Sequence, residues 1–303
     1  MTEVTPKIYW LASYPKSGNT WLRSFIVALQ NVTGEIDAAT ANEANTDNVI
    51  DADIDLNALR TGAIASSREW VENALGFSID SLSPDEIDML RPAAYRYLNT
   101  VAERASYHKV HDAYSYVGKD GTKQPMFPQD ATRGALYIVR NPLDVSISYA
   151  NHAKLSIDDA IARLNNPANA FCKTEIGQAN QLRQWLWRWS EHVRSWQQAD
   201  FPVKMVRYED MRLKPLETFT SIARFLELPH DQAAIEAALE LTRFERLQAK
   251  ERESGFREKP QGVASFFRKG MVGDWRNTLS PEQIDSIIRD HHDVMAELGY
   301  LEQ

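Results

Sequence analysis

The sequence predicts an α/β fold in which helices flank a central parallel sheet, as one domain over residues 1–303. Two apolar runs of strand length, residues 8–13 and 134–139, are each followed by a short turn and then by apolar positions at helical spacing. The first turn contains one glycine, as expected of a phosphate-binding loop. A chain of 303 residues can form one sizeable core of this kind, although two small domains would also fit.

Residues 14–21, Tyr-Pro-Lys-Ser-Gly-Asn-Thr-Trp, form a P-loop-like turn between the first strand and the first helix. A helix N-terminus offers unpaired backbone N–H groups and a partial positive charge, so an anion binds there favourably. Gly18 lets the backbone approach that anion, while Lys16, Ser17 and Thr20 add a cation and two hydroxyls. The pattern departs from G-x-x-x-x-G-K-[ST], because the lysine precedes the glycine and the first glycine is missing. We therefore expect an anion site that does not hydrolyse ATP, with an ordinary βα turn as the alternative.

A second anion-binding element follows the buried strand at residues 134–139. Pro142 suits the first turn of a helix, so Arg140 lies at the strand end and Ser148 about two turns along the helix. A guanidinium at this position can fork onto a phosphate. The alternative is an arginine that caps a strand and a serine on a helix face.

The third element is residues 267–277, Phe-Arg-Lys-Gly-Met-Val-Gly-Asp-Trp-Arg-Asn. Arg268 and Lys269 precede Gly270, and two adjacent cations before a glycine form a compact anion clamp in which backbone and side chains can both reach a phosphate.

In this order the three elements resemble those of the soluble PAPS-dependent sulfotransferases (PAPS is 3′-phosphoadenosine 5′-phosphosulfate). The family has Y-P-K-S-G-T-T-W, R-N-P-x-D-V-x-x-S and R-K-G-x-x-G-D-W-K-N, so Asn19 stands where the family has a threonine. The resemblance implies PAPS as cofactor, adenosine 3′,5′-bisphosphate as product and a small-molecule acceptor, with the 3′-phosphate on the second and third elements. The cofactor contacts that it implies are Lys16, Ser17, Gly18, Asn19, Thr20, Trp21, Arg140, Ser148, Tyr208, Thr242, Phe244, Arg268, Lys269 and Gly270.

Two further segments resemble the family's adenine-binding elements. Residues 205–211 contain Tyr-Glu-Asp-Met after a predicted strand, which implies that Tyr208 lies near the base. Residues 241–244 resemble the family's T-x-F, which closes over the same base, and Trp21 would stack on its other side.

Two of the three predicted catalytic residues, Lys109 and His111, lie at the end of a further strand, residues 107–111, and the third is Lys16. Lys109 and His111 alternate onto one face of it, whereas His108 faces the other side. The family has K-T-H here, which implies that His111 deprotonates the acceptor and Lys109 approaches the transferring group. Lys16 would stabilise the leaving oxygen, with Ser17 restraining that lysine between turnovers. This chemistry requires no metal in principle.

Composition excludes several other classes of protein. The net charge of −8 argues against a general nucleic-acid surface, and no apolar run approaches the length of a membrane span. The N-terminal residues lack a signal-peptide core, and the single cysteine, Cys172, excludes an internal disulfide framework and favours a reducing compartment. We therefore expect a cytoplasmic enzyme in which Cys172 is structural or exposed.

Other segments are less legible. The acidic residues 35–59 predict a solvated, mobile connection or else a lid, and the charge-rich residues 245–266 predict a long loop. Residues 178–199 predict a helix whose tryptophans form a core-facing stripe: Trp185, Trp189 and Trp196. Serine, proline and an acid or amide at 83–86 and at 280–283 predict two helix starts.

Two other functions stay open on this sequence: a small-molecule kinase, and a PAP(S)-binding protein without catalysis. The acceptor could be a hydroxyl or, with less support, an amine. The sequence does not decide whether the protein forms a homodimer. The family's dimer motif is K-x-x-x-T-V-x-x-x-E, and residues 276–281 depart from it at the T-V pair.

Overall fold

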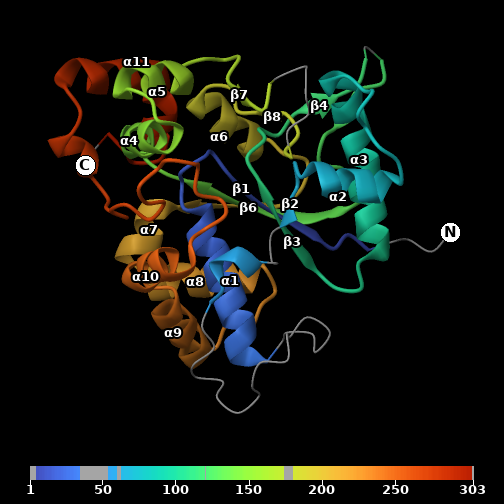
Figure 1. The fold of residues 1–303 in the computed structure, drawn as a ribbon, viewed down its shortest axis with the longest axis horizontal. Coiled ribbons are helices and arrows are strands. Elements are labelled where there is room, and N and C mark those ends of the chain that lie inside the picture. The colour runs from blue at the N-terminus through green and yellow to red at the C-terminus, as the bar shows by residue number, and fades with distance from the viewer. Residues whose placement is uncertain (1–4, 35–53, 60–62, 120, 174–179, 302–303) are drawn as a thin grey trace.

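The computed structural model describes residues 5–34, 54–59, 63–119, 121–173 and 180–301 (Figure 1). In these residues the core is a five-stranded sheet of order β2-β3-β1-β6-β9, in which neighbouring strands are parallel. The predicted α/β fold with a central parallel sheet is thus confirmed. The strands of the sheet are β1 (Ile8–Ser13), β2 (Ala63–Ile64), β3 (Ser106–Val110), β6 (Thr132–Val139) and β9 (Val203–Arg207). Two short antiparallel pairs lie outside it: β4 (Tyr116–Val117) with β5 (Gln124–Pro125), and β7 (Ala170–Phe171) with β8 (Gln184–Trp185).

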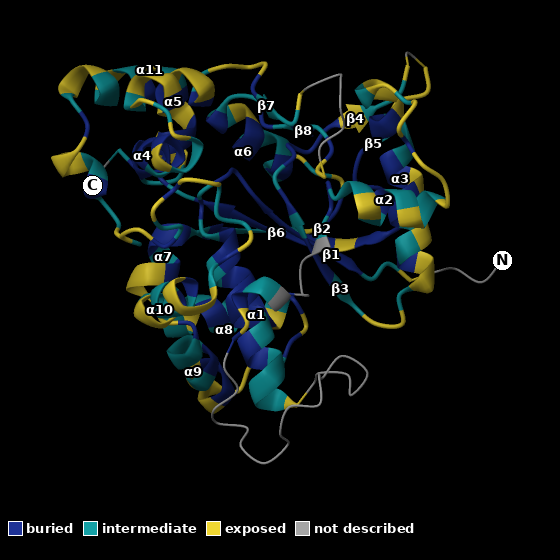
Figure 2. Ribbon diagram, in the orientation of Figure 1, coloured by how far each residue is buried: buried dark blue, intermediate teal, exposed yellow. Residues whose placement is uncertain are grey.

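Helices cover both faces of the sheet, and the strands between them are almost completely buried (Figure 2). Alternate residues of β1 serve the two faces: Ile8 and Trp10 pack towards α3, α4, α5, α6 and α11, whereas Tyr9 and Leu11 pack towards α1, α7, α8 and α9. The helices are α1 (Asn19–Thr33), α2 (Arg68–Leu75), α3 (Pro84–Val101), α4 (Pro142–Ala153), α5 (Ile157–Leu164), α6 (Trp189–Gln197), α7 (Tyr208–Leu213), α8 (Pro215–Phe225), α9 (Gln232–Leu241), α10 (Phe244–Ser254) and α11 (Pro281–Glu297), with the 3₁₀ turns η2 (Leu56–Ala58) and η3 (Asp274–Asn277).

Both predicted helix starts are confirmed. The Ser83 hydroxyl accepts from the Glu86 N–H at the start of α3, and Ser280 accepts from the Gln283 N–H at the start of α11. In each case the third-position side chain also accepts from the N–H of its serine, which completes a capping box.

The prediction of one helix over residues 178–199 is wrong. Gln184 and Trp185 pair with β7, and Trp187 adopts a left-handed conformation (φ 54°), so α6 begins only at Trp189. Trp189 and Trp196 are completely buried as predicted, but Trp185 lies outside their helix, with the guanidinium of Arg183 4.9 Å from its ring centroid. The spacing of the tryptophans is compatible with a helix, but residues 184–185 pair with β7 instead, so tertiary packing and not the local pattern decides their structure.

The prediction of a continuous loop over residues 245–266 is also wrong in its first half. α10 runs from Phe244 to Ser254 with Leu247 and Glu251 turned inward, and it ends at Gly255. Its high charge belongs to the solvent-facing side of a helix. Residues 35–53 of the predicted acidic connection lie outside the described residues. Across the described ranges, no helix combines the length and apolar content that crossing a bilayer requires.

Candidate active site

The carboxyl ends of β1, β3, β6 and β9 meet at one edge of the sheet, around a cavity of about 660 Å³. This is the edge at which open α/β sheets bind ligands. Fourteen of the predicted site residues line the cavity, although they come from segments spread between positions 16 and 270: Lys16, Gly18, Asn19, Thr20, Trp21, Lys109, His111, Arg140, Ser148, Tyr208, Phe244, Arg268, Lys269 and Gly270.

Two predicted cofactor contacts, Ser17 and Thr242, are not among the lining residues. Ser17 is completely buried, and its hydroxyl has no hydrogen-bond partner among the described residues. The Thr242 hydroxyl donates to the carbonyl of Ala238 (2.8 Å) at the end of α9. Their contacts with a cofactor stay predictions.

The loop before α1 needs its glycine for two reasons. Gly18 has φ +107°, and a Cβ there would lie 2.7 Å from the Tyr208 ring. Only a backbone without a side chain can therefore pack on Tyr208 at this point. Asn19, which replaces the family's threonine, uses its amide inside the protein: Nδ2 donates to the Leu11 carbonyl (2.8 Å) and fixes the loop against β1.

Arg140 joins the three predicted elements. Its Nη1 donates to the Lys16 carbonyl (3.1 Å) and its Nη2 to the Met271 carbonyl (3.0 Å), while the guanidinium lies 4.4 Å from the centroid of the Tyr208 ring. Its buried Nε has no partner in the described part of the chain. A buried N–H of this kind, beside a helix N-terminus, suits an anionic ligand.

The two C-terminal cations share one carboxylate. Arg268 and Lys269 both pair with Asp274 (3.1 and 2.7 Å), and the carboxylate of Asp144 on α4 accepts from the N–H groups of Gly273 and Trp275. Asp144 therefore brings residues 268–274 to the cavity. Both aspartates belong to the quoted motifs, but the sequence alone assigns them no role: Asp274 pairs with cations five and six positions before it, whereas no local pattern could pair Asp144 with residues about 130 positions away.

Aromatic rings form one wall of the cavity. Trp21 meets Tyr208 edge-on, with ring centroids 6.2 Å apart. The Phe244 ring closes over Gly270, where a Cβ would lie only 2.6 Å from it. Three of the four predicted adenine contacts are therefore in one place, whereas Thr242 is buried and does not line the cavity.

Lys16 has a partner that the sequence did not predict. Its Nζ lies 3.4 Å from His152 Nδ1 and 3.9 Å from the centroid of the Phe266 ring. The Ser17 hydroxyl makes no hydrogen bond to Lys16 in this structure, and the restraint of Lys16 by Ser17 stays a prediction. Burial lowers the pKa of the Lys16 ammonium to about 7, and the nearby charges of Lys109 and Arg140 act in the same direction.

Lys109 lies in a buried ion-pair cluster that the sequence does not indicate. Glu258, from the loop after α10, binds Lys109 Nζ (2.9 Å) and Arg23 Nη1 (2.8 Å). Burial raises the pKa of the Glu258 carboxyl, but Lys109 and Arg23 outweigh it and hold that pKa at about 2. Burial is also the main cause of the lowered pKa of Lys109. The only sequence signal is the charge density of residues 245–266, which gives no partner.

His111 presents a neutral imidazole with a defined tautomer. Its Nδ1 lies 2.8 Å from the carbonyl oxygen of Ser13, which can only accept, so Nδ1 carries the hydrogen and Nε2 keeps a lone pair. Burial, and then the charge of Lys109, lower the pKa of His111 well below its usual range. His108 instead packs on the Trp70 ring, with centroids 4.6 Å apart, on the opposite face of β3. An unprotonated Nε2 on a residue that lines the same cavity as Lys16 and Lys109 is equipped to accept a proton.

Among the described residues, no group of three or more His, Cys, Asp or Glu side chains could hold a metal ion. Cys172 is half-buried and does not line the cavity.

Comparison with known proteins identifies the family. A model described as "sulfotransferase domain" matches residues 6–299. Cytosolic sulfotransferase 16 of Arabidopsis thaliana is 25% identical over 95% of this chain and 77% of its own length, and flavonol 3-sulfotransferase of Flaveria bidentis is 23% identical over 93% and 80%.

Solved structures share the fold at low identity. Mouse sulfotransferase SULT7A1 complexed with PAP superimposes with a TM-score of 0.56 and 19% identity, covering 96% of this chain and 84% of its own. Retinol dehydratase complexed with androsterone and PAP gives a TM-score of 0.59 and 17% identity, with coverages of 96% and 81%. The chain therefore belongs to the sulfotransferase family and is a PAPS-dependent sulfotransferase.

Proposed function

We propose that this enzyme transfers the sulfuryl group of PAPS to a hydroxyl of a small organic acceptor, with His111 as the general base. PAPS supplies an activated sulfuryl group. The observation that carries the proposal is the His111 tautomer, which leaves a lone pair on Nε2 in the same cavity as Lys16 and Lys109. His111 Nε2 takes the proton of the acceptor hydroxyl, and the Lys16 ammonium meets the negative charge that develops on the leaving oxygen.

The cavity suits the charge and shape of PAPS. We assign the 5′-phosphosulfate to the loop at residues 16–20 and to α1, where the unpartnered Ser17 hydroxyl and the backbone N–H groups are donors. The 3′-phosphate belongs to Arg140, Ser148, Arg268 and Lys269. The adenine belongs to Trp21, Tyr208 and Phe244, with Thr242 as a supporting contact. All of these except Ser17 and Thr242 line the cavity.

Two observations support an acceptor class: the apolar residues that line the cavity outside the proposed PAPS site, and the names of related proteins. Phe171 and Phe266 add apolar surface to the cavity that His111 also lines, which suits an aromatic or alicyclic alcohol. A relative is named for a flavonol, and a structural neighbour holds androsterone. An amine is the second choice of acceptor. We also propose that the enzyme acts in the cytoplasm, as the names of relatives called cytosolic sulfotransferases suggest.

Radiolabelled PAPS incubated with a panel of phenols, sterols and amines tests the reaction. Replacing His111 by Ala should lower turnover by about 10²–10⁴-fold on an alcohol whose pKa is well above the assay pH, with little change in affinity for adenosine 3′,5′-bisphosphate. His108→Ala is the matched control, because His108 lies on the same strand and faces away from the cavity. Equal turnover in His111→Ala and wild type would refute the base assignment.

The same assay separates the two other functions. We expect transfer to continue in EDTA. Activity that needs Mg²⁺ and uses ATP as donor would indicate a kinase, and binding of adenosine 3′,5′-bisphosphate without transfer to any acceptor would indicate a non-catalytic binding protein.

A further inference from the structure

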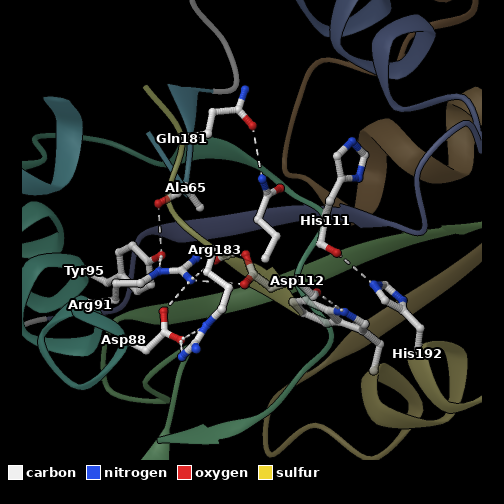
Figure 3. Close-up of polar contacts among 11 residues, drawn as sticks. Ala65, Asp88, Arg91, Tyr95, His111, Asp112, Gln181, Arg183 and His192 are labelled. Carbon is white, nitrogen blue, oxygen red and sulfur yellow. Dashed lines mark hydrogen bonds and ion pairs between the residues drawn. The ribbon is translucent and has the colours of Figure 1, made fainter. Parts of the chain in front are cut away.

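The strand that carries His111 stops pairing in the sheet just before that residue. β3 ends at Val110, whose last sheet partner is Ala12 of β1. His111 and Asp112 are then held by side chains from α3 and α6, which approach from different directions (Figure 3). A general base needs its position fixed to a fraction of an ångström, so the source of this hold matters for the reaction.

His192 of α6 holds the His111 backbone. Its Nε2 lies 3.0 Å from the His111 carbonyl oxygen, so Nε2 must carry the hydrogen, and Nδ1 then accepts from the Tyr137 hydroxyl at 2.8 Å. His192 is completely buried, and burial lowers its pKa to about 4. The ring therefore stays neutral and keeps this donor arrangement at neutral pH.

Asp112 is held at both its carboxylate and its backbone. Arg91 of α3 donates Nη1 and Nη2 to the two carboxylate oxygens (3.1 and 2.9 Å), and the indole N–H of Trp196 donates to the Asp112 carbonyl (3.0 Å). Arg91 is itself fixed, because its Nε donates to the Tyr95 hydroxyl (2.9 Å). Each of these side chains is buried.

A buried ion pair of this kind contributes little net stability compared with well-packed apolar side chains, so its placement calls for another reason. We propose that Arg91, Asp112, His192 and Trp196, together the β3 clamp, are positioning residues that fix the His111 ring against Ser13 with its lone pair on Nε2. This inference rests on the proposed function, in which His111 is the base. The clamp holds the backbone just past Val110, where strand pairing no longer does so. In this position His111 Nδ1 lies 2.8 Å from the Ser13 carbonyl oxygen.

The clamp can be broken at one atom. His192→Leu removes the donor to the His111 carbonyl, whereas the side-chain amide of His192→Gln can place an N–H where Nε2 was. His291→Leu is the matched control: His291 is also buried, packs on Trp189 of α6, and hydrogen-bonds Ser190 and Asn165, away from β3.

The first readout is the tautomer. In protein labelled with ¹⁵N-histidine, two-bond ¹H–¹⁵N spectra distinguish Nδ1–H from Nε2–H rings, and the His111 signal is the one lost in His111→Ala. We expect wild type, His192→Gln and His291→Leu to show His111 with hydrogen on Nδ1, and His192→Leu to show a mixture of tautomers. The second readout is turnover, which should fall about 10–100-fold in His192→Leu with unchanged affinity for adenosine 3′,5′-bisphosphate.

Asp112→Asn provides a second test if His192→Leu does not fold, because Arg91 keeps Asp88 as a partner (3.3 Å). It should also mix the His111 tautomers. Unchanged His111 spectra in the folded clamp variants, or equal changes in His291→Leu, would overturn the inference. Wild-type turnover in His111→Ala would instead overturn the proposed function, while the spectra would still decide whether the clamp sets the tautomer.

Discussion

Two buried ion-pair clusters flank the end of β3, and the pKa values of their carboxyl groups shift in opposite directions. The core cluster is Asp112 with Arg91 and Asp88, and the cavity cluster is Glu258 with Lys109 and Arg23. Burial raises the pKa of Asp112 despite Arg91, whereas Lys109 and Arg23 outweigh burial and lower the pKa of Glu258 to about 2.

The difference follows from the charges next to each carboxylate. Asp112 pairs with one guanidinium, that of Arg91, and lies near a second carboxylate, Asp88, which itself pairs with Arg183. Glu258, by contrast, pairs with two cations. The positions differ as well: helices enclose the core cluster, but Glu258 belongs to the loop after α10 and lines the cavity. The core cluster therefore belongs to the scaffold, whereas the anion of the cavity cluster is supplied by a loop that lines the cavity.

The largest expected effect tests the core cluster. Arg91→Ala leaves the Asp112 carboxylate buried without its guanidinium, which should lower the free energy of unfolding by about 3–5 kcal/mol. Glu258→Gln should cost only about 1–3 kcal/mol, because the loop can shift and admit water to Lys109 and Arg23. Urea unfolding of both variants measures the two costs. Equal losses would show that the loop is as rigid as the helices.

The second prediction concerns acid. Since the folded pKa of Glu258 is about 2 and its ordinary value is 4.5, its ionised form stabilises the fold above about pH 4.5, and this contribution is lost as pH falls towards 2. We expect wild type to lose about 3 kcal/mol more than Glu258→Gln between pH 5 and pH 2. Asp112, whose pKa is raised, has the opposite sign: its contribution is present at low pH and is lost as pH rises. Parallel pH profiles for wild type and Glu258→Gln would contradict the assignment for Glu258.

Sequence patterns predict much of this site because its elements are local. About ten consecutive residues are enough to indicate a strand, a turn and the start of a helix. Such patterns alone predict that the loop at 14–21 and Arg140, at the end of β6, lie at the carboxyl edge of the sheet. They predict the same position for Lys109 and His111. Capping boxes are equally local, and both were predicted correctly.

The clusters could not be predicted for the opposite reason. Arg23 and Glu258 are 235 positions apart, and Arg91 meets Asp112 only because α3 packs beside the end of β3. Each charge alone is typical of a solvated surface, and pairing is decided by tertiary packing. The same holds for His152, whose sequence context indicates only a helix, although its ring lies against Lys16.

Lys16 differs from both clusters, because its described contacts are a neutral imidazole and an aromatic ring rather than a carboxylate. The prediction with the smallest expected effect concerns this residue. Its pKa of about 7 means that the ammonium loses its proton as pH rises through neutrality. A bound phosphate would supply the missing anion and raise that pKa, so binding of adenosine 3′,5′-bisphosphate should take up part of a proton near pH 7.5.

Affinity for this ligand should then weaken by about 1 kcal/mol per pH unit between pH 7.5 and 8.5, a range in which the ligand's phosphates are already fully ionised. Calorimetry in two buffers of different ionisation enthalpy measures both the affinity and the proton uptake. Lys16→Met should bind more weakly at pH 7 and lose most of the pH slope, since the titrating group is gone. A wild-type affinity that does not change over this range, without proton uptake, would mean that Lys16 stays charged in the free enzyme and has a counter-ion after all.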